Sequence, residues 1–159
     1  MTKEELIKRI EKVFETVPYP GDQEITIHPL GLEEELEDYF RGKTWKGHPA
    51  EKLRDHQDAL GLFTPAGYHY FLPAFLIATL EGENDLGWHI GFGLERGNER
   101  STIKGKTKEE LFTERIRLFS EEQVHTLIEF FRCLQETDIE SMVDYERVIE
   151  NLSAFLNGK

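Results

Sequence analysis

Apolar residues recur every three or four positions over most of the chain, which is the spacing of amphipathic helices. The clearest case begins at Ser120, which forms a capping box with Gln123. The apolar stripe that follows consists of Val124, Leu127, Ile128, Phe131 and Leu134. The same spacing predicts further helices over about 2–17, 31–40, 49–63, 107–119 and 145–156.

One segment, Phe63–Leu80, is apolar on nearly every side and contains two prolines. Thr64 is a suitable N-cap and Pro65 a suitable first helical residue. Pro73 cannot donate to the carbonyl of His69, so we expect a bent helix, or two short ones, over about 65–81. Because its apolar residues surround the axis, this helix should run through the middle of the domain.

Three segments lack a helical pattern. Glu24–Pro29 alternates weakly and predicts a short edge strand. Residues Trp88–Leu94 alternate between large apolar residues and His or Gly, which predicts an extended segment. Asn98–Lys106 is polar and reads as a mobile loop. The predicted fold is therefore mainly α: one helical domain over residues 1–159, around a central Pro-kinked apolar helix, with at most one short strand pair.

The composition narrows the choice of partners. A chain of 159 residues can bury a sizeable core without disulfides or metals. Its net charge of −12 argues against nucleic acid and against an anionic membrane surface. The same charge is compatible with a basic protein partner or with solubility alone. The longest apolar run, Phe71–Leu80, is about half of a membrane span, and the start lacks a signal-peptide pattern, so we expect a cytoplasmic protein.

No motif of enzyme chemistry is complete. Gly-Lys-Thr occurs at Gly42–Thr44 and at Gly105–Thr107, but both lack the upstream glycine of a phosphate-binding loop. Glu122 and His125 form a single Glu-x-x-His, where di-metal bundles need two. No serine lies in a Gly-x-Ser-x-Gly turn. We predict no catalytic residue, no metal and no cofactor.

Basic and aromatic residues gather after the acidic helix. Arg41 and Trp45 share one loop with two lysines, and Arg54 and His56 follow on the next helix. Such a group can hold an anion or a carboxylate-bearing partner. The alternative is that Trp45 packs at the edge of the core while Arg41 and Arg54 pair with the acidic helix.

Two further sets complete the candidate binding residues. If the helix bends at Pro73, Tyr68 and Tyr70 join the basic and aromatic group in lining a pocket. The acidic helix supplies a separate surface for a basic partner, made of Glu33, Glu34, Glu37 and Asp38.

Four stretches resemble a family of small bacterial proteins of unknown function. They are VPYPGDQEI (17–25), YFRGKTWKG (39–47), LRDHQDALGLFTPAGYHYFLPAFLIATLE (53–81) and FSEEQVHTLIEFFRCL (119–134). The chain departs from that pattern at residues 66–68, where an acidic residue, Ala and Phe are usual, and at His69, where a basic residue such as Arg is common. The resemblance implies a bacterial origin and a mostly helical domain, and it carries no activity.

Three functions remain open. The first is a non-enzymatic binding protein, of the immunity type or an inhibitor of a basic protein, which the acidic charge favours. The second is a small-molecule binder or enzyme with a pocket near Pro73. The third is a helical module for interaction or oligomerisation.

Overall fold

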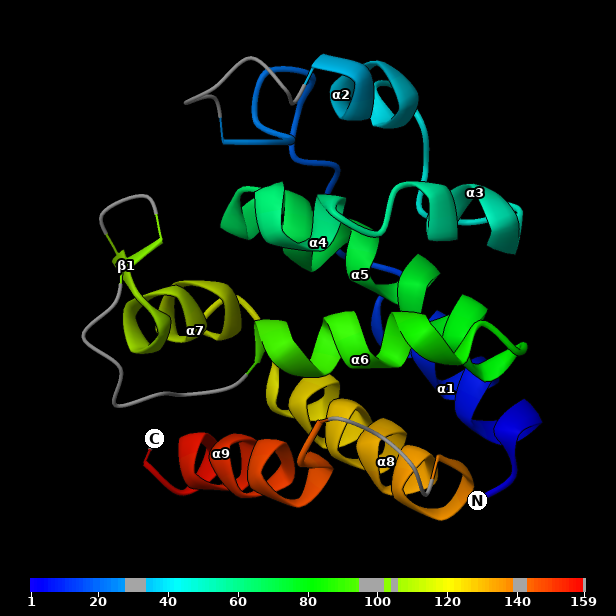
Figure 1. Cartoon of the computed structure of the whole chain (residues 1–159), viewed down its shortest axis with the longest axis vertical. Helices are drawn as coiled ribbons and strands as arrows, with labels where there is room; N and C mark the ends of the chain where they lie inside the picture. The colour runs from blue at the N-terminus through cyan, green and yellow to red at the C-terminus, as the bar shows by residue number, and fades with distance from the viewer. Residues whose placement is uncertain (28–33, 95–101, 104–105, 139–142, 159) are drawn as a thin grey trace.

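The computed structural model describes residues 1–27, 34–94, 102–103, 106–138 and 143–158, and Figure 1 shows how its elements are arranged. The helices are α1 (Lys3–Val13), α2 (Glu34–Phe40), α3 (Ala50–Asp55), α4 (Ala59–Leu62), α5 (Pro65–Leu80), α6 (Asn84–Gly93), α7 (Lys108–Ile116), α8 (Glu121–Thr137) and α9 (Tyr145–Asn157). Two short strands, β1 (Thr102–Ile103) and β2 (Lys106–Thr107), pair antiparallel. The predicted mainly α fold with one short strand pair is confirmed.

Side-chain caps fix where the main helices begin. The Thr2 hydroxyl accepts from the third backbone amide of α1, and the Thr64 hydroxyl does the same for α5. Thr107 and Ser120 each complete a capping box, before α7 and α8 respectively. These caps satisfy amides that have no partner within their helix, so the sequence located these four starts well.

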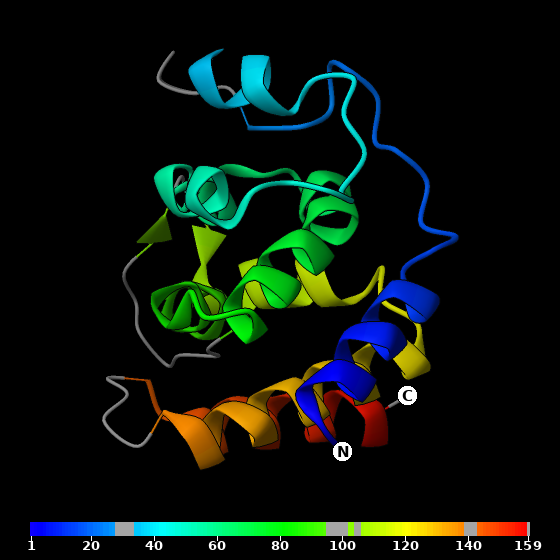
Figure 2. The same ribbon diagram turned by 90° about the vertical axis from the view of Figure 1, so that its right-hand side faces the viewer.

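The central position of α5 is confirmed. Most of its side chains are buried, including those on opposite sides of its axis. It contacts α1, α3, α6 and α7, and Figure 2 shows it between α2 at one end and the α8–α9 pair at the other. The helix runs through Pro73 as one element. Of the two expectations, the pair of short helices is therefore wrong.

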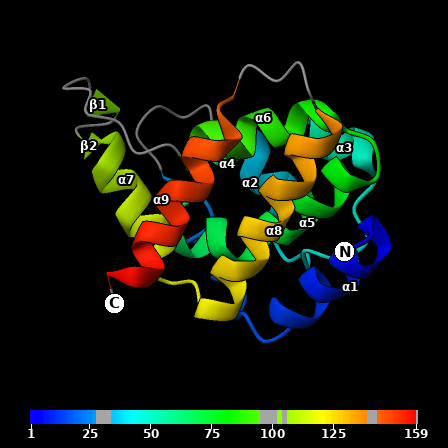
Figure 3. The same ribbon diagram turned by 90° about the horizontal axis from the view of Figure 1, so that it is seen from below.

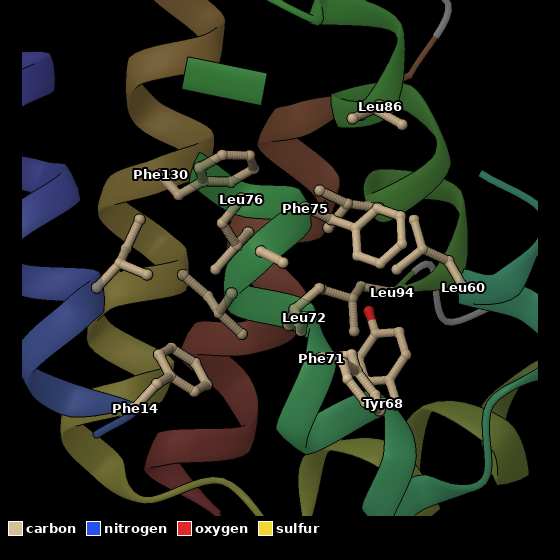
Figure 4. Packing of buried hydrophobic residues seen from close by; sticks show 14 of the residues in the cluster. Phe14, Leu60, Tyr68, Phe71, Leu72, Phe75, Leu76, Leu86, Leu94 and Phe130 are labelled. Carbon is tan, nitrogen blue, oxygen red and sulfur yellow. The ribbon is translucent and has the colours of Figure 1, made fainter. Parts of the chain in front are cut away.

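One hydrophobic cluster joins these elements. In Figure 4, Leu76 of α5 lies on the side of Phe130 from α8, and Phe75 lies on the side of Leu86 from α6. Helices α8 and α9 pack side by side, as Figure 3 shows from below, and α1 lies against α8.

The extended segment predicted over Trp88–Leu94 is wrong, because most of it belongs to α6. The apparent alternation comes from glycines that the helix needs for close packing. A Cβ on Gly87 would lie 2.8 Å from Leu134 Cδ1, and one on Gly91 would lie 2.7 Å from Val143 Cγ1. These glycines are four residues apart, so both lie on the same side of the helix, and Tyr145 is near both.

Two other segments differ from expectation. The helix predicted over 49–63 is divided into α3 and α4 by a turn at residues 56–58, where the His56 amide bonds carbonyls three and four residues back. The edge strand predicted from Glu24 is only an isolated antiparallel bridge between Thr26 and Phe63. Residues 28 and 29 of that strand, and 98–101 and 104–105 of the predicted mobile loop, lie outside the described residues.

Candidate functional site

Tyr19 connects the loop at Asp22 and the loop at Gly42 to the central helix α5. Its hydroxyl accepts a hydrogen bond from the Gly42 amide at 2.8 Å and donates one to the Asp22 carboxylate at 2.6 Å. Its ring lies edge-on to the rings of Tyr70 and Phe71. Gly42 has a φ of 73°, a conformation that favours glycine. These contacts stabilise the two loops and their packing on α5.

A tyrosine–histidine pair closes the loop after α2. His48 Nε2 lies 2.6 Å from the Thr44 carbonyl, which fixes the proton on this nitrogen, so Nδ1 accepts from the Tyr39 hydroxyl at 2.8 Å. Burial lowers the pKa of His48 and raises the pKa of Tyr39, which keeps both groups neutral. The His56 ring lies 4.5 Å from that of Tyr39. Both His48 nitrogens are thus engaged inside the loop.

The acidic helix uses two of its carboxylates internally. Glu37 is buried and accepts a hydrogen bond from the Thr26 hydroxyl at 2.6 Å. Arg41 lies 3.5 Å from Glu37 and 2.8 Å from Asp38. A basic partner at this face would therefore compete with Arg41 for the Asp38 carboxylate.

The remaining residues of the basic and aromatic group are dispersed. Trp45 is buried, and its indole belongs to the hydrophobic cluster. Arg54 lies 3.7 Å from Glu83, which follows α5, so its ion pair is with that residue. Glu33 and the side chain of Glu34 lie outside the described residues. The structure therefore brings Arg41 to the acidic helix and takes Arg54 elsewhere.

The two tyrosines of α5 face different neighbours. Both are buried, at 0% and 7% exposure for Tyr68 and Tyr70. Residues two apart on a helix are about 200° apart around the axis, so they cannot line one side. Tyr70 contacts Tyr19, whereas Tyr68 lies near Phe119, at the start of α8.

Gln123 joins three helices, and sequence reasoning found only its capping role. Its side-chain oxygen accepts from the Ser120 amide at 2.9 Å and from His69 Nε2 at 2.8 Å. Its amide nitrogen donates to the Val13 carbonyl at 2.9 Å. Burial lowers the pKa of His69, which keeps the ring neutral in this position. The residue links the end of α1, the first half of α5 and the start of α8.

Sequence reasoning missed a buried arginine on α7. Arg115 is 8% exposed, and its Nη1 donates to the Gly93 carbonyl at 2.9 Å. Its guanidinium carbon lies 5.0 Å from the centre of the Tyr68 ring. The signal was present, because Arg115 follows Phe112 by three residues and precedes Phe119 by four, on the apolar side of its helix.

A surface hollow of about 470 Å³ lies between α8 and α9. It is lined by Glu121, His125, Ile128, Glu129, Arg132, Ser153, Leu156 and Asn157. His125 follows Glu121 by four residues and precedes Glu129 by four, so all three share one side of α8. Arg132 already pairs with Glu129 at 2.8 Å, so the hollow keeps an excess of negative charge.

A second hollow, of about 430 Å³, lies on α7 and is lined by Thr107, Glu109, Glu110, Thr113 and Glu114. Neither hollow contains any of the six residues predicted to line a pocket near Pro73.

The described part of the chain offers neither a metal centre nor a membrane span. Within the described ranges, no group of three His, Cys, Asp or Glu residues is placed to hold a metal ion. The described helices are all too short or too polar to cross a membrane. Cys133 is half-buried, and burial raises the pKa of its thiol, which disfavours the reactive thiolate.

The fold and these sites define an all-α domain with a buried arginine and an acidic hollow. Residues 2–155 match the model of a family of unknown function (DUF6714), so the chain belongs to that family. No curated protein and no solved structure matches the chain. The expected membership of an uncharacterised family is confirmed, and the bacterial origin stays a prediction.

Proposed function

We propose that this protein binds a basic segment of another protein, without chemistry of its own, and that the α8–α9 face receives that segment. The observation that carries this proposal is the acidic hollow between the two helices. A lysine or arginine side chain of a partner would complement the charge of this hollow. The Glu121 carboxylate lines the hollow, and its single arginine, Arg132, is already paired with Glu129.

The charge of the two helices supports the same proposal. Together α8 and α9 contain six glutamates and two arginines, which leaves a net charge of −4. Four of these glutamates, namely Glu121, Glu122, Glu136 and Glu150, are exposed and have no basic partner in the described part of the chain. A surface of one sign attracts an oppositely charged partner and speeds association at low salt.

The acidic helix predicted from sequence is the alternative docking surface. Asp38 is exposed there, but both it and the buried Glu37 already lie against Arg41. For that reason we place the main contact on α8–α9 and keep α2 as a competing surface in the experiment.

The test compares two pairs of charge-removing substitutions. In the hollow, Glu121→Gln with Glu129→Gln removes two negative charges. As the matched control, Glu81→Gln with Asp85→Asn removes two exposed charges at the α5–α6 turn. Each variant is titrated with a defined arginine-rich peptide and used to capture proteins from a lysate at low salt.

We expect the hollow variant to bind the peptide about three- to thirtyfold more weakly and the control to bind nearly as well as the wild type. The captured protein should be basic and should be lost with the hollow variant alone. Equal weakening in both variants would show that binding depends only on the net charge of the protein. A third variant, Asp38→Asn, tests α2, and loss of binding in this variant alone would move the site to α2. Self-association without a partner would favour an oligomerisation module.

A further inference from the structure

Arg115 carries a buried charge with little compensation. Its side chain is more than nine-tenths buried, and among the residues that the structure describes its guanidinium donates a hydrogen bond only to the Gly93 carbonyl. Among the described residues, no carboxylate lies within ion-pair distance of it. A guanidinium has five N–H donors and does not lose its charge, so a single carbonyl leaves most of its binding capacity unused.

The neighbouring hydroxyl is also without a partner. Tyr68 is completely buried, and its hydroxyl makes no hydrogen bond with any of the described residues. Leaving such a group unpaired costs about 1–3 kcal/mol, and folded proteins contain few of them. Figure 4 shows the hydroxyl directed toward Leu94, the residue that follows α6.

Both groups meet at Gly93, at the end of α6. A Cβ on this glycine would lie 3.3 Å from Arg115 Nη1 and 3.8 Å from the Tyr68 hydroxyl. The cation and the hydroxyl therefore approach the same point from α7 and α5, where α6 contributes no side chain.

We propose that Arg115, Tyr68 and Gly93 form a binding site for the carboxylate group of a small organic acid. The planar guanidinium offers two parallel N–H donors to a carboxylate, and the tyrosine hydroxyl donates a third hydrogen bond. This site is separate from the α8–α9 hollow and does not depend on the function proposed for it.

The charge of the site selects a carboxylate over a phosphate. One guanidinium and one neutral hydroxyl balance a single negative charge. A phosphate dianion would leave one charge uncompensated beside the buried Leu94, in a chain of net charge −12. The alternative is that Arg115 only caps the carbonyl end of α6, which explains its hydrogen bond to Gly93. This alternative does not explain the unpaired Tyr68 hydroxyl.

The site can be tested by titrating the protein with sodium acetate and sodium benzoate, against sodium chloride at equal ionic strength. The probe is the Nε–H resonance of Arg115 in an NMR spectrum of the labelled protein. We expect this resonance to shift in a saturable way by about 100 mM, which corresponds to millimolar affinity. Sodium phosphate at the same ionic strength should bind more weakly than acetate.

Three variants separate binding from folding. Arg115→Lys keeps the charge but loses the paired donors and the Nε–H probe, so its titration is followed at the backbone amide of Gly93, where we expect about tenfold weaker binding. Tyr68→Phe should weaken binding about three- to tenfold while remaining folded, which keeps the test valid if the lysine variant is unstable. Arg117→Lys, at an exposed arginine two residues on, should bind like the wild type.

The proposal is overturned if the Arg115 resonance does not saturate. It is also overturned if Tyr68→Phe binds acetate as well as the wild type, or if phosphate binds more tightly than acetate.

Discussion

Replacing Tyr68 by Phe should make the protein more stable at neutral pH. The substitution removes one oxygen, which is buried and has no hydrogen-bond partner in the described ranges of the chain. An unpaired buried hydroxyl costs about 1–3 kcal/mol, and a weaker contact of the phenyl ring with Arg115 offsets part of the gain. We therefore expect the free energy of unfolding to rise by about 1 kcal/mol, which for a chain of this size raises Tm by about 2–4 °C.

The advantage should grow at alkaline pH. Burial raises the pKa of Tyr68 to about 12, from 10.0 for an exposed tyrosine. Below pH 10 the hydroxyl keeps its proton in both the folded and the unfolded chain, so its contribution is constant. Between pH 10 and 12 the unfolded chain loses this proton first, and the wild type loses about 2–3 kcal/mol of stability that the variant keeps.

Urea unfolding at pH 8 and pH 11 measures both effects. Tyr39→Phe is the matched control, because it removes a hydroxyl that is bonded to His48, and it should lower stability by about 1 kcal/mol at pH 8. A Tyr68→Phe variant that is less stable than the wild type at pH 8 would refute the reasoning. So would a difference that does not widen at pH 11.

Three further outcomes can be checked by urea unfolding. Gly67→Ala should destabilise the fold by about 1–3 kcal/mol, because the added Cβ would lie 2.3 Å from a backbone carbonyl oxygen. Gly61→Ala, where nothing lies within 4 Å of the added Cβ, should be neutral or stabilising by up to about 1 kcal/mol. Equal effects of the two substitutions would contradict this prediction. Gln123→Ala should lower the free energy of unfolding by about 2–4 kcal/mol, whereas Gln135→Ala, at an exposed position, should lower it by less than about 0.5 kcal/mol. A small effect of Gln123→Ala would show that the hydrogen bonds of Gln123 are replaceable. Because burial lowers the pKa of His69, its neutral ring stabilises the fold fully above about pH 6.5, and the free energy of unfolding should fall as the pH decreases below that value. A free energy of unfolding that does not change from pH 7.5 to 5.5 would count against the buried neutral ring.

The sequence predicted the helix starts well where a cap and an apolar stripe agree, as at Ser120 and Thr107. It failed at α6, because His89, Gly91 and Gly93 looked like the small or polar positions of an alternating strand. At Gly91 the reason for a glycine is the close approach of α6 to Val143, which depends on distant parts of the chain.

The candidate site was harder to predict than the fold. The helical period alone separates Tyr68 from Tyr70, so that part of the pocket hypothesis could have been questioned from the sequence. The pairing of Arg54 with Glu83, and the meeting of Arg115 with Gly93, depend on how α3, α6 and α7 pack on α5. Spacing along one helix does not contain that information.

The link through Gln123 also bears on how the chain is made. The Val13 carbonyl and the Gln123 amide are 110 residues apart, and α1 packs its apolar side, with Leu6 and Ile10, against α5 and α8. A ribosome that has released only the first hundred residues has delivered α1 and α5, but not α8. The nascent chain must therefore carry part of this apolar surface uncovered until the last third is synthesised, a period in which chaperones have a surface to bind.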